Sequence, residues 1–114
     1  MIYLASPYTH PDAQVREARF RAACRKTADM LRDGVLTYSP IVHSHPLSLL
    51  GLPGDWPFWA AHNERMLESS SALHVLQLPG WEESRGIQAE VQIAGGLHLP
   101  VRYEAVSDPC PEPS

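Results

Sequence analysis

Short apolar segments alternate with longer amphipathic segments along this chain, and this alternation limits the folds that it can adopt. The apolar segments span residues 2–5, 35–38, 72–78 and 99–103. The amphipathic segments, with apolar side chains at helical spacing, span residues 12–32, 56–70 and 85–95. Strands that alternate with helices form a parallel sheet, because each helix carries the chain back across one face. The sequence therefore predicts a three-layer α/β domain, flavodoxin-like or Rossmann-like, with four to five parallel strands flanked by helices.

The segment 41–55 interrupts this alternation. It holds Pro46 and Pro53 together with two glycines, so we expect a long loop there, and long loops in compact domains are usually functional. Asp55 is expected to cap the helix that follows it. We predict one domain over residues 1–106 and a disordered proline-rich tail over residues 107–114.

Composition excludes several classes of protein. With 44% hydrophobic and 19% charged residues the chain is globular, and its net charge of −4 argues against a nucleic-acid polymer as partner. No apolar run is long enough to span a membrane, and the first residues lack the basic segment of a signal peptide. Cys24 and Cys110 predict no disulfide framework. We expect a cytoplasmic protein with no membrane association.

Ligands of open parallel sheets bind beyond the carboxyl ends of the strands, where the strand order reverses. In a flavodoxin-like order this point lies between the first and third strands, beside the loops 6–10 and 79–85. The second loop leads directly into a helix, whose free N–H groups and positive dipole end attract an anion. We therefore expect a site for a small anionic ligand there.

Glu90 lies on the inward face of that helix. Ile87, Val91 and Ala94 mark the apolar stripe, and Glu90 falls on the same stripe near the start of the helix. A carboxylate at this position faces the expected crevice and is a candidate for catalysis. The alternative is a structural ion pair with an arginine such as Arg85 at the edge of the stripe.

Cofactor motifs are absent from the sequence. It contains neither G-x-G-x-x-G nor a P-loop. His43 and His45, with His10 and His62, suggest a metal, but no cysteine or suitably spaced carboxylate completes a ligand set. We expect no metal and no cofactor, and we expect the histidines to line a pocket or to cap backbone groups.

Several motifs together resemble the nucleoside 2-deoxyribosyltransferase-like superfamily. The segment from Tyr3 to Tyr8 resembles the opening of these proteins, and Gly80–Glu90 resembles their catalytic segment. The spacing Ser84-x-Gly86-x-x-x-Glu90 also occurs in the related nucleoside 5′-monophosphate N-glycosidases. Short bacterial and phage members carry motifs similar to Ser39–Pro46, Gly54–Trp59 and Gly80–Gly86.

The resemblance implies a role for each matching residue. Glu90 would attack the anomeric carbon, Tyr3 would orient Glu90, and Ser84 with Gly86 would receive a 5′-phosphate. The other residues expected to contact the substrate are Ser6, Tyr8, His43, His45, Trp59 and Arg85. Such small members commonly pair, and the Trp and Leu content of residues 47–59 agrees with a homodimer.

One position departs from the family pattern. The family usually places an aspartate on the second long helix to manage the proton of the leaving base, and Asn63 stands there. An amide forms hydrogen bonds but cannot protonate a base. His62, Glu64 or a loop histidine would then supply the proton, or activity is low, or the protein only binds. A shift of the alignment by one residue would make Glu64 the counterpart.

The sequence therefore predicts an N-glycosidase. It would hydrolyse the N-glycosidic bond of a nucleoside or deoxynucleoside 5′-monophosphate through a glycosyl-enzyme intermediate on Glu90. The alternatives are a nucleoside 2-deoxyribosyltransferase and a non-catalytic nucleotide-binding module.

Overall fold

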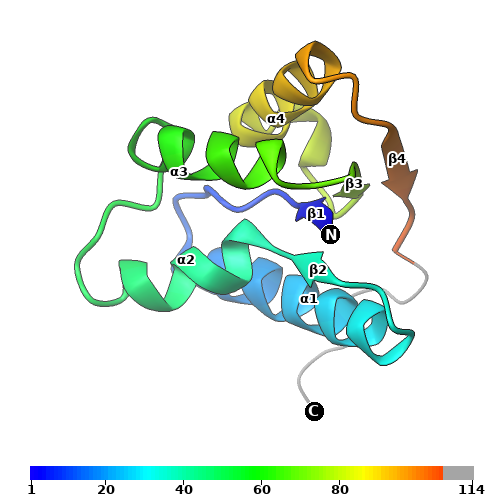
Figure 1. Ribbon diagram of the computed structural model, residues 1–114. Coiled ribbons are helices and arrows are strands. Elements are labelled where there is room, and N and C mark those ends of the chain that lie inside the picture. Colours follow the sequence, from blue (N-terminus) through cyan, green and yellow to red (C-terminus); the bar gives the residue numbers. More distant parts are fainter. Residues whose placement is uncertain (107–114) are drawn as a thin grey trace.

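A four-stranded parallel sheet forms the centre of the molecule, which is described here from a computed structural model (Figure 1). The structure describes residues 1–106, so the predicted tail over 107–114 lies outside the described residues. The strands are β1 (Ile2–Ala5), β2 (Thr37–Tyr38), β3 (Ala72–Leu76) and β4 (Val101–Glu104). Their order is β2-β1-β3-β4 and all the pairings are parallel. The sheet order therefore reverses between β1 and β3, as predicted.

Helices cover both faces of this sheet. They are α1 (Ala13–Arg32), α2 (Pro40–Ser48), α3 (Trp56–Glu68) and α4 (Arg85–Gly96), with a short 3₁₀ turn, η1 (Trp81–Glu83). Figure 1 shows α1 and α2 on one face and α3 and α4 on the other. This arrangement confirms the predicted three-layer α/β fold. None of the helices in the described part of the chain is long and apolar enough to cross a membrane.

Alternation along β1 divides the core between the two faces. Tyr3 and Ala5 pack in the cluster that contains Leu67 of α3 and Ile87 of α4. Leu4 packs in the other cluster, against α1. Successive side chains of a strand point to opposite faces of the sheet. Tyr3 therefore lies on the face that α3 and α4 cover, and its hydroxyl points toward these helices.

The predicted loop over residues 41–55 is wrong in its first half, because α2 begins at Pro40. The Ser39 hydroxyl accepts a hydrogen bond from the Val42 N–H and caps the helix. Proline is well tolerated at the first helical position, since its missing N–H would have had no partner there. The sequence predicted a loop because a proline such as Pro46 usually breaks a helix, but α2 accommodates it. The histidines of this segment therefore lie on a helix, and the loop covers only residues 49–55.

The expected role of Asp55 also differs. It occupies the N-cap position of α3, but its side chain makes no capping hydrogen bond. Asp12 before α1 and Ser84 before α4 do cap their helices, through the N–H groups of Gln14 and Ile87. The Asp55 carboxylate is therefore free for another use.

Candidate active site

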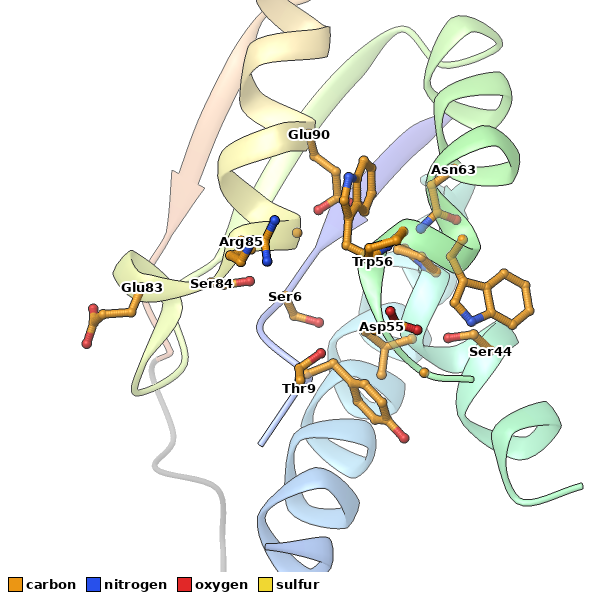
Figure 2. Close-up of a pocket in the computed structure, with 17 residues that line it drawn as sticks. Ser6, Thr9, Ser44, Asp55, Trp56, Asn63, Glu83, Ser84, Arg85 and Glu90 are labelled. Atoms are coloured by element: carbon orange, nitrogen blue, oxygen red, sulfur yellow. The ribbon is translucent and has the colours of Figure 1, made fainter. Parts of the chain in front are cut away.

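A cavity of about 330 Å³ opens at the carboxyl ends of β1 and β3 (Figure 2). Its walls come from the loop after β1, from α2, from the start of α3, and from the η1–α4 junction. Eight of the predicted site residues line it: Ser6, Tyr8, Trp59, Asn63, Ser84, Arg85, Gly86 and Glu90. The cavity lies at the predicted reversal of strand order.

Arg19 holds the two loops of this cavity together. Its guanidinium donates to the carbonyl of Thr9 at 3.1 Å and to that of Pro79 at 3.0 Å. A β-carbon on Gly80 would lie only 2.6 Å from the guanidinium, and Gly80 adopts a φ of 91°. The close approach and the left-handed backbone both favour glycine there. Arg19 was not singled out from the sequence, because nothing in the helical pattern separates it from its solvated neighbours.

Glu90 is buried at the wall of the cavity. It is 4% exposed, and the Tyr3 hydroxyl donates a hydrogen bond to its Oε2. Ile87 and Ala94 on the same face of α4 are buried against the sheet, and this packing fixes the carboxyl group beside β1. In the described part of the chain the ion pairs do not join Glu90 to Arg85. The structural alternative raised for Glu90 is therefore not realised.

Burial dominates the titration of this pair. It raises the pKa of Glu90 to about 8, while the hydrogen bond from Tyr3 acts in the opposite direction. Burial, followed by the charge of Glu90, also raises the pKa of Tyr3 and brings that of Tyr38 to about 12. Tyr3 therefore remains a neutral phenol and a donor at any physiological pH. Burial therefore keeps Glu90 protonated to a higher pH than an exposed glutamate, and a cavity residue with so strongly shifted a pKa is a candidate for catalysis.

The start of α4 forms one side of the cavity. Ser84 Oγ accepts a hydrogen bond from the Ile87 N–H at 3.2 Å, so the Ser84 hydroxyl proton is still available to a ligand. Figure 2 shows Ser84 and Arg85 on the same side as Ser6. Ser6 is 6% exposed, and its Oγ has no hydrogen-bond partner within residues 1–106. A helix start, a guanidinium and an unpaired buried hydroxyl together can hold an anion.

Asn63 of α3 is the residue that faces the cavity from the opposite side. It is 7% exposed and lines the cavity, whereas His62 and Glu64 are exposed and do not line it. The structure therefore brings Asn63, and not Glu64, to the cavity. The Asn63 Oδ1 lies 3.3 Å from His62 Nδ1, within hydrogen-bonding distance. The cavity therefore has an amide at the position where the family resemblance implies a carboxylic acid.

His45 acts on the cavity through Tyr8. The imidazole is 4% exposed, and its Nε2 lies 2.9 Å from Glu17 Oε1. A carboxylate only accepts, so Nε2 donates to Glu17, while Nδ1 lies 2.6 Å from the Tyr8 hydroxyl, within hydrogen-bonding distance. The hydrogen bond from His45 lowers the pKa of Glu17. This chain fixes Tyr8 in the wall, and His45 itself does not line the cavity.

His43 also lies outside the lining of the cavity. Its ring stacks on His62, with centroids 5.0 Å apart, and meets the edge of Trp59 at 5.9 Å. The Trp59 N–H donates to the Pro53 carbonyl at 2.7 Å and fastens the loop 49–55 to α3. His43 therefore supports the wall that Trp59 forms. Within residues 1–106 no His, Cys, Asp and Glu side chains gather in a group of three that could hold a metal ion.

Part of the lining was not singled out from the sequence. Besides the eight residues above, the cavity is lined by Thr9, Pro40, Ile41, Ser44, Gly54, Asp55, Trp56, Pro57 and Glu83. Most belong to α2 or to the junction of the loop with α3. A correct reading of Ser39-Pro40 as a helix start would have brought α2 to the site. The sequence predicted Asp55 only as the cap of the helix that follows it.

Comparison with known proteins identifies a family without assigning an activity. Residues 1–104 match a family described as a domain of unknown function (DUF1937). No curated protein matches the chain. Because the match covers nearly all of the chain, this protein is a member of the family described as domain of unknown function DUF1937.

Proposed function

We propose that this protein hydrolyses the N-glycosidic bond of a nucleoside or deoxynucleoside 5′-monophosphate, with Glu90 as the nucleophile. The observation that carries the proposal is the buried Glu90 carboxyl, which lines the cavity and accepts a hydrogen bond from Tyr3. The motifs shared with nucleoside 2-deoxyribosyltransferase-like proteins support the same chemistry. The proposal is that of a cytoplasmic enzyme that acts on a small molecule.

The reaction divides into two displacements. In the first, a Glu90 carboxylate oxygen bonds to the anomeric carbon while the carbon–nitrogen bond breaks and its electron pair leaves with the base. In the second, the oxygen of a water molecule bonds to the anomeric carbon while the bond from that carbon to Glu90 breaks, so the sugar phosphate is released and the Glu90 carboxylate is regenerated. The proton that this water loses balances the proton that the departed base takes up from solvent. Splitting one difficult displacement into two easier ones is the use of a covalent intermediate. The Tyr3 hydroxyl would hold the attacking oxygen in one orientation.

The start of α4 supports a phosphate ligand. The Ser84 hydroxyl proton and the Arg85 guanidinium can each donate to a phosphate oxygen. Ser6 offers a hydroxyl that is buried without a partner in the described residues, and a phosphate oxygen would satisfy it. A nucleoside without phosphate would leave this hydroxyl unsatisfied. The geometry therefore favours a monophosphate over a nucleoside as substrate.

Asn63 supports a second candidate, a nucleotide-binding module without catalysis. The amide lines the cavity where a carboxylic acid would protonate the leaving base. Such a module would retain a nucleotide and release nothing from it.

A screen of nucleoside 5′-monophosphates for free base separates these functions. The purified protein is incubated with each ribo- and deoxyribonucleotide and with the matching nucleoside, and the products are separated by chromatography. Release of base from monophosphates in preference to nucleosides supports the N-glycosidase. Base exchange with an added second base, without net hydrolysis, indicates a 2-deoxyribosyltransferase. Binding of a nucleotide without any release of base indicates the binding module.

A further inference from the structure

Trp56 differs from the other aromatic side chains around the cavity, because its ring has no partner. Trp59 packs against His43 and Phe58, and Tyr8 packs against His45. Within residues 1–106 no aromatic ring contacts that of Trp56, and its indole N–H donates to no group. A large ring left without a partner in a cavity wall is available to a planar ligand.

The Trp56 ring also lies close to the proposed nucleophile. Trp56 is the first residue of α3, and Figure 2 shows its indole beside the Glu90 side chain. Its Cε3 lies 3.9 Å from the point that a β-carbon on Gly86 would occupy, so the ring reaches across to the start of α4. In the proposed function Glu90 attacks the anomeric carbon, and the base is attached to that carbon. A base bound there would meet the Trp56 ring.

Asp55 adds an unpaired charge at the same place. It lines the cavity and is exposed, it makes no capping bond to α3, and it takes part in none of the ion pairs within the described part of the chain. Ser44 of α2 also lines the cavity. Figure 2 shows Asp55 and Ser44 on the side opposite Ser84 and Arg85. The proposed phosphate-binding side, at the start of α4, therefore faces a side of the cavity on which Asp55 offers a carboxylate and Ser44 a hydroxyl.

This donor and acceptor pattern favours one base. A carboxylate accepts two parallel hydrogen bonds, and guanine presents N1–H and the N2 amino group side by side. The neighbouring O6 of guanine accepts a hydrogen bond, which a serine hydroxyl can donate. Adenine and cytosine place an acceptor nitrogen beside their amino group, and uracil places carbonyls on both sides of its N–H. Each of these bases would set a lone pair against the carboxylate.

We infer that Trp56, Asp55 and Ser44 form a base subsite that selects guanine, with Trp56 stacking on the ring and Asp55 binding the N1–H and N2 amino edge. The substrate would then be guanosine or deoxyguanosine 5′-monophosphate. This inference rests on the proposed function for the placement of the sugar and phosphate. Selective binding of guanine is nevertheless measurable without turnover.

The test is calorimetric titration of the full chain, as wild type and as Glu90→Gln, with GMP, IMP, AMP, CMP, UMP and ribose 5-phosphate. GMP should bind at least about tenfold more tightly than AMP, CMP or UMP, because each unpaired polar contact costs on that order. Trp56→Leu should weaken GMP about five- to 150-fold, the range for loss of one base–aromatic stack, and should change ribose 5-phosphate less than twofold. Tyr103→Leu, which alters an exposed ring of β4 outside the cavity, should change neither.

Asp55 is tested by the ratio of GMP to IMP affinity, since IMP lacks only the N2 amino group. Asp55→Asn should bring this ratio close to one, whereas Asp12→Asn, at the cap of α1, should leave it unchanged. Four results would each overturn the subsite. The first two are an unchanged ratio of GMP to IMP affinity in Asp55→Asn and equal affinity of the wild type for all the nucleotides. The others are no binding of GMP and a Trp56→Leu variant that weakens ribose 5-phosphate as much as GMP. Guanine-selective binding without release of base by the wild type would overturn the proposed function alone. Equal release of every base would overturn the subsite alone.

Discussion

A carboxyl group buried as deeply as that of Glu90 destabilises the folded protein whenever it is ionised. Its pKa of about 8 lies above the ordinary value of 4.5, so the folded state binds the proton more tightly than the unfolded state. The resulting stabilisation is complete below pH 4.5 and is lost as the pH rises through 8. The proposed nucleophile therefore lowers the stability of the protein under the conditions in which it would react.

Replacing Glu90 by Gln should raise the free energy of unfolding, and more so at high pH. Gln keeps an acceptor for the Tyr3 hydroxyl and does not ionise. Between pH 4.5 and 8 the wild type should lose up to about 1.4 kcal/mol per pH unit relative to the variant. Urea unfolding at pH 5 and pH 9 measures this difference. Glu64→Gln, on the exposed face of α3, serves as the control, and a difference for Glu90→Gln that does not change with pH would contradict the account.

Asn63→Asp should increase the rate of base release. The side chain at position 63 is buried in the cavity, and burial together with Glu90 favours the protonated form of an aspartate there, which donates a proton. Positioned general-acid catalysis contributes about 10²–10⁴-fold, so the gain should be largest for bases that leave poorly. Steady-state rates with several bases measure it, with Glu64→Asp as the control. A slower Asn63→Asp enzyme would mean that the amide suits its substrate, and an equal rate would place residue 63 away from the leaving base.

Single residues differ in how well the sequence predicted them. The inward position of Glu90 followed from helical spacing with Ile87 and Ala94, because a long amphipathic helix orients each of its residues. Asp55 and Trp56 lie at a junction between a loop and a helix, where no period applies. The missing capping bond of Asp55 depends on its local backbone, which the residue type does not report.

At the scale of elements, the strand and helix alternation predicted every crossover, because apolar periodicity reports burial directly. The same periodicity did not predict α2, because its nine residues include two prolines and no amphipathic stripe. The helix forms because Ser39 caps it and Ile41 packs with Tyr8 and Ala23. Ser39-Pro40 is a local signal for the start of this helix, but the packing of Ile41 is tertiary and leaves no apolar periodicity in the sequence.

The Ser84→Ala variant tests two roles of the Ser84 hydroxyl at the start of α4. The hydroxyl caps α4 through the Ile87 N–H and is proposed to donate to the phosphate. Loss of the cap should cost about 1 kcal/mol of stability. Loss of a hydrogen bond to a charged oxygen should weaken 5′-monophosphates roughly ten- to a hundredfold more than nucleosides.

Ser39→Ala is the matched control for this experiment. It removes the cap of α2, and Ser39 itself does not line the cavity, so the change should lower stability without altering the preference for monophosphates. Thermal unfolding and titration with a nucleotide and its nucleoside measure both effects. Equal weakening of the two ligands by Ser84→Ala would show that Ser84 does not contact the phosphate.

At the scale of the whole molecule, residues 49–58 expose several large apolar side chains. Leu49 and Leu50, at the end of α2, are 72% and 83% exposed, and Leu52 and Phe58 are also exposed. Clustered exposed apolar side chains mark interaction surfaces, so we predict that two copies pair through this face. Sedimentation at micromolar concentration should give the mass of a dimer, and Leu50→Lys should give a monomer. A monomeric wild type would refute the prediction.

The central claim is that Glu90 attacks the sugar, and the release of free base from nucleoside 5′-monophosphates by wild type and by Glu90→Ala tests it most directly. The wild type should release base from at least one monophosphate. The variant should release none while its circular dichroism spectrum and cooperative unfolding remain those of a folded protein. Release of base by folded Glu90→Ala at the wild-type rate would contradict the claim.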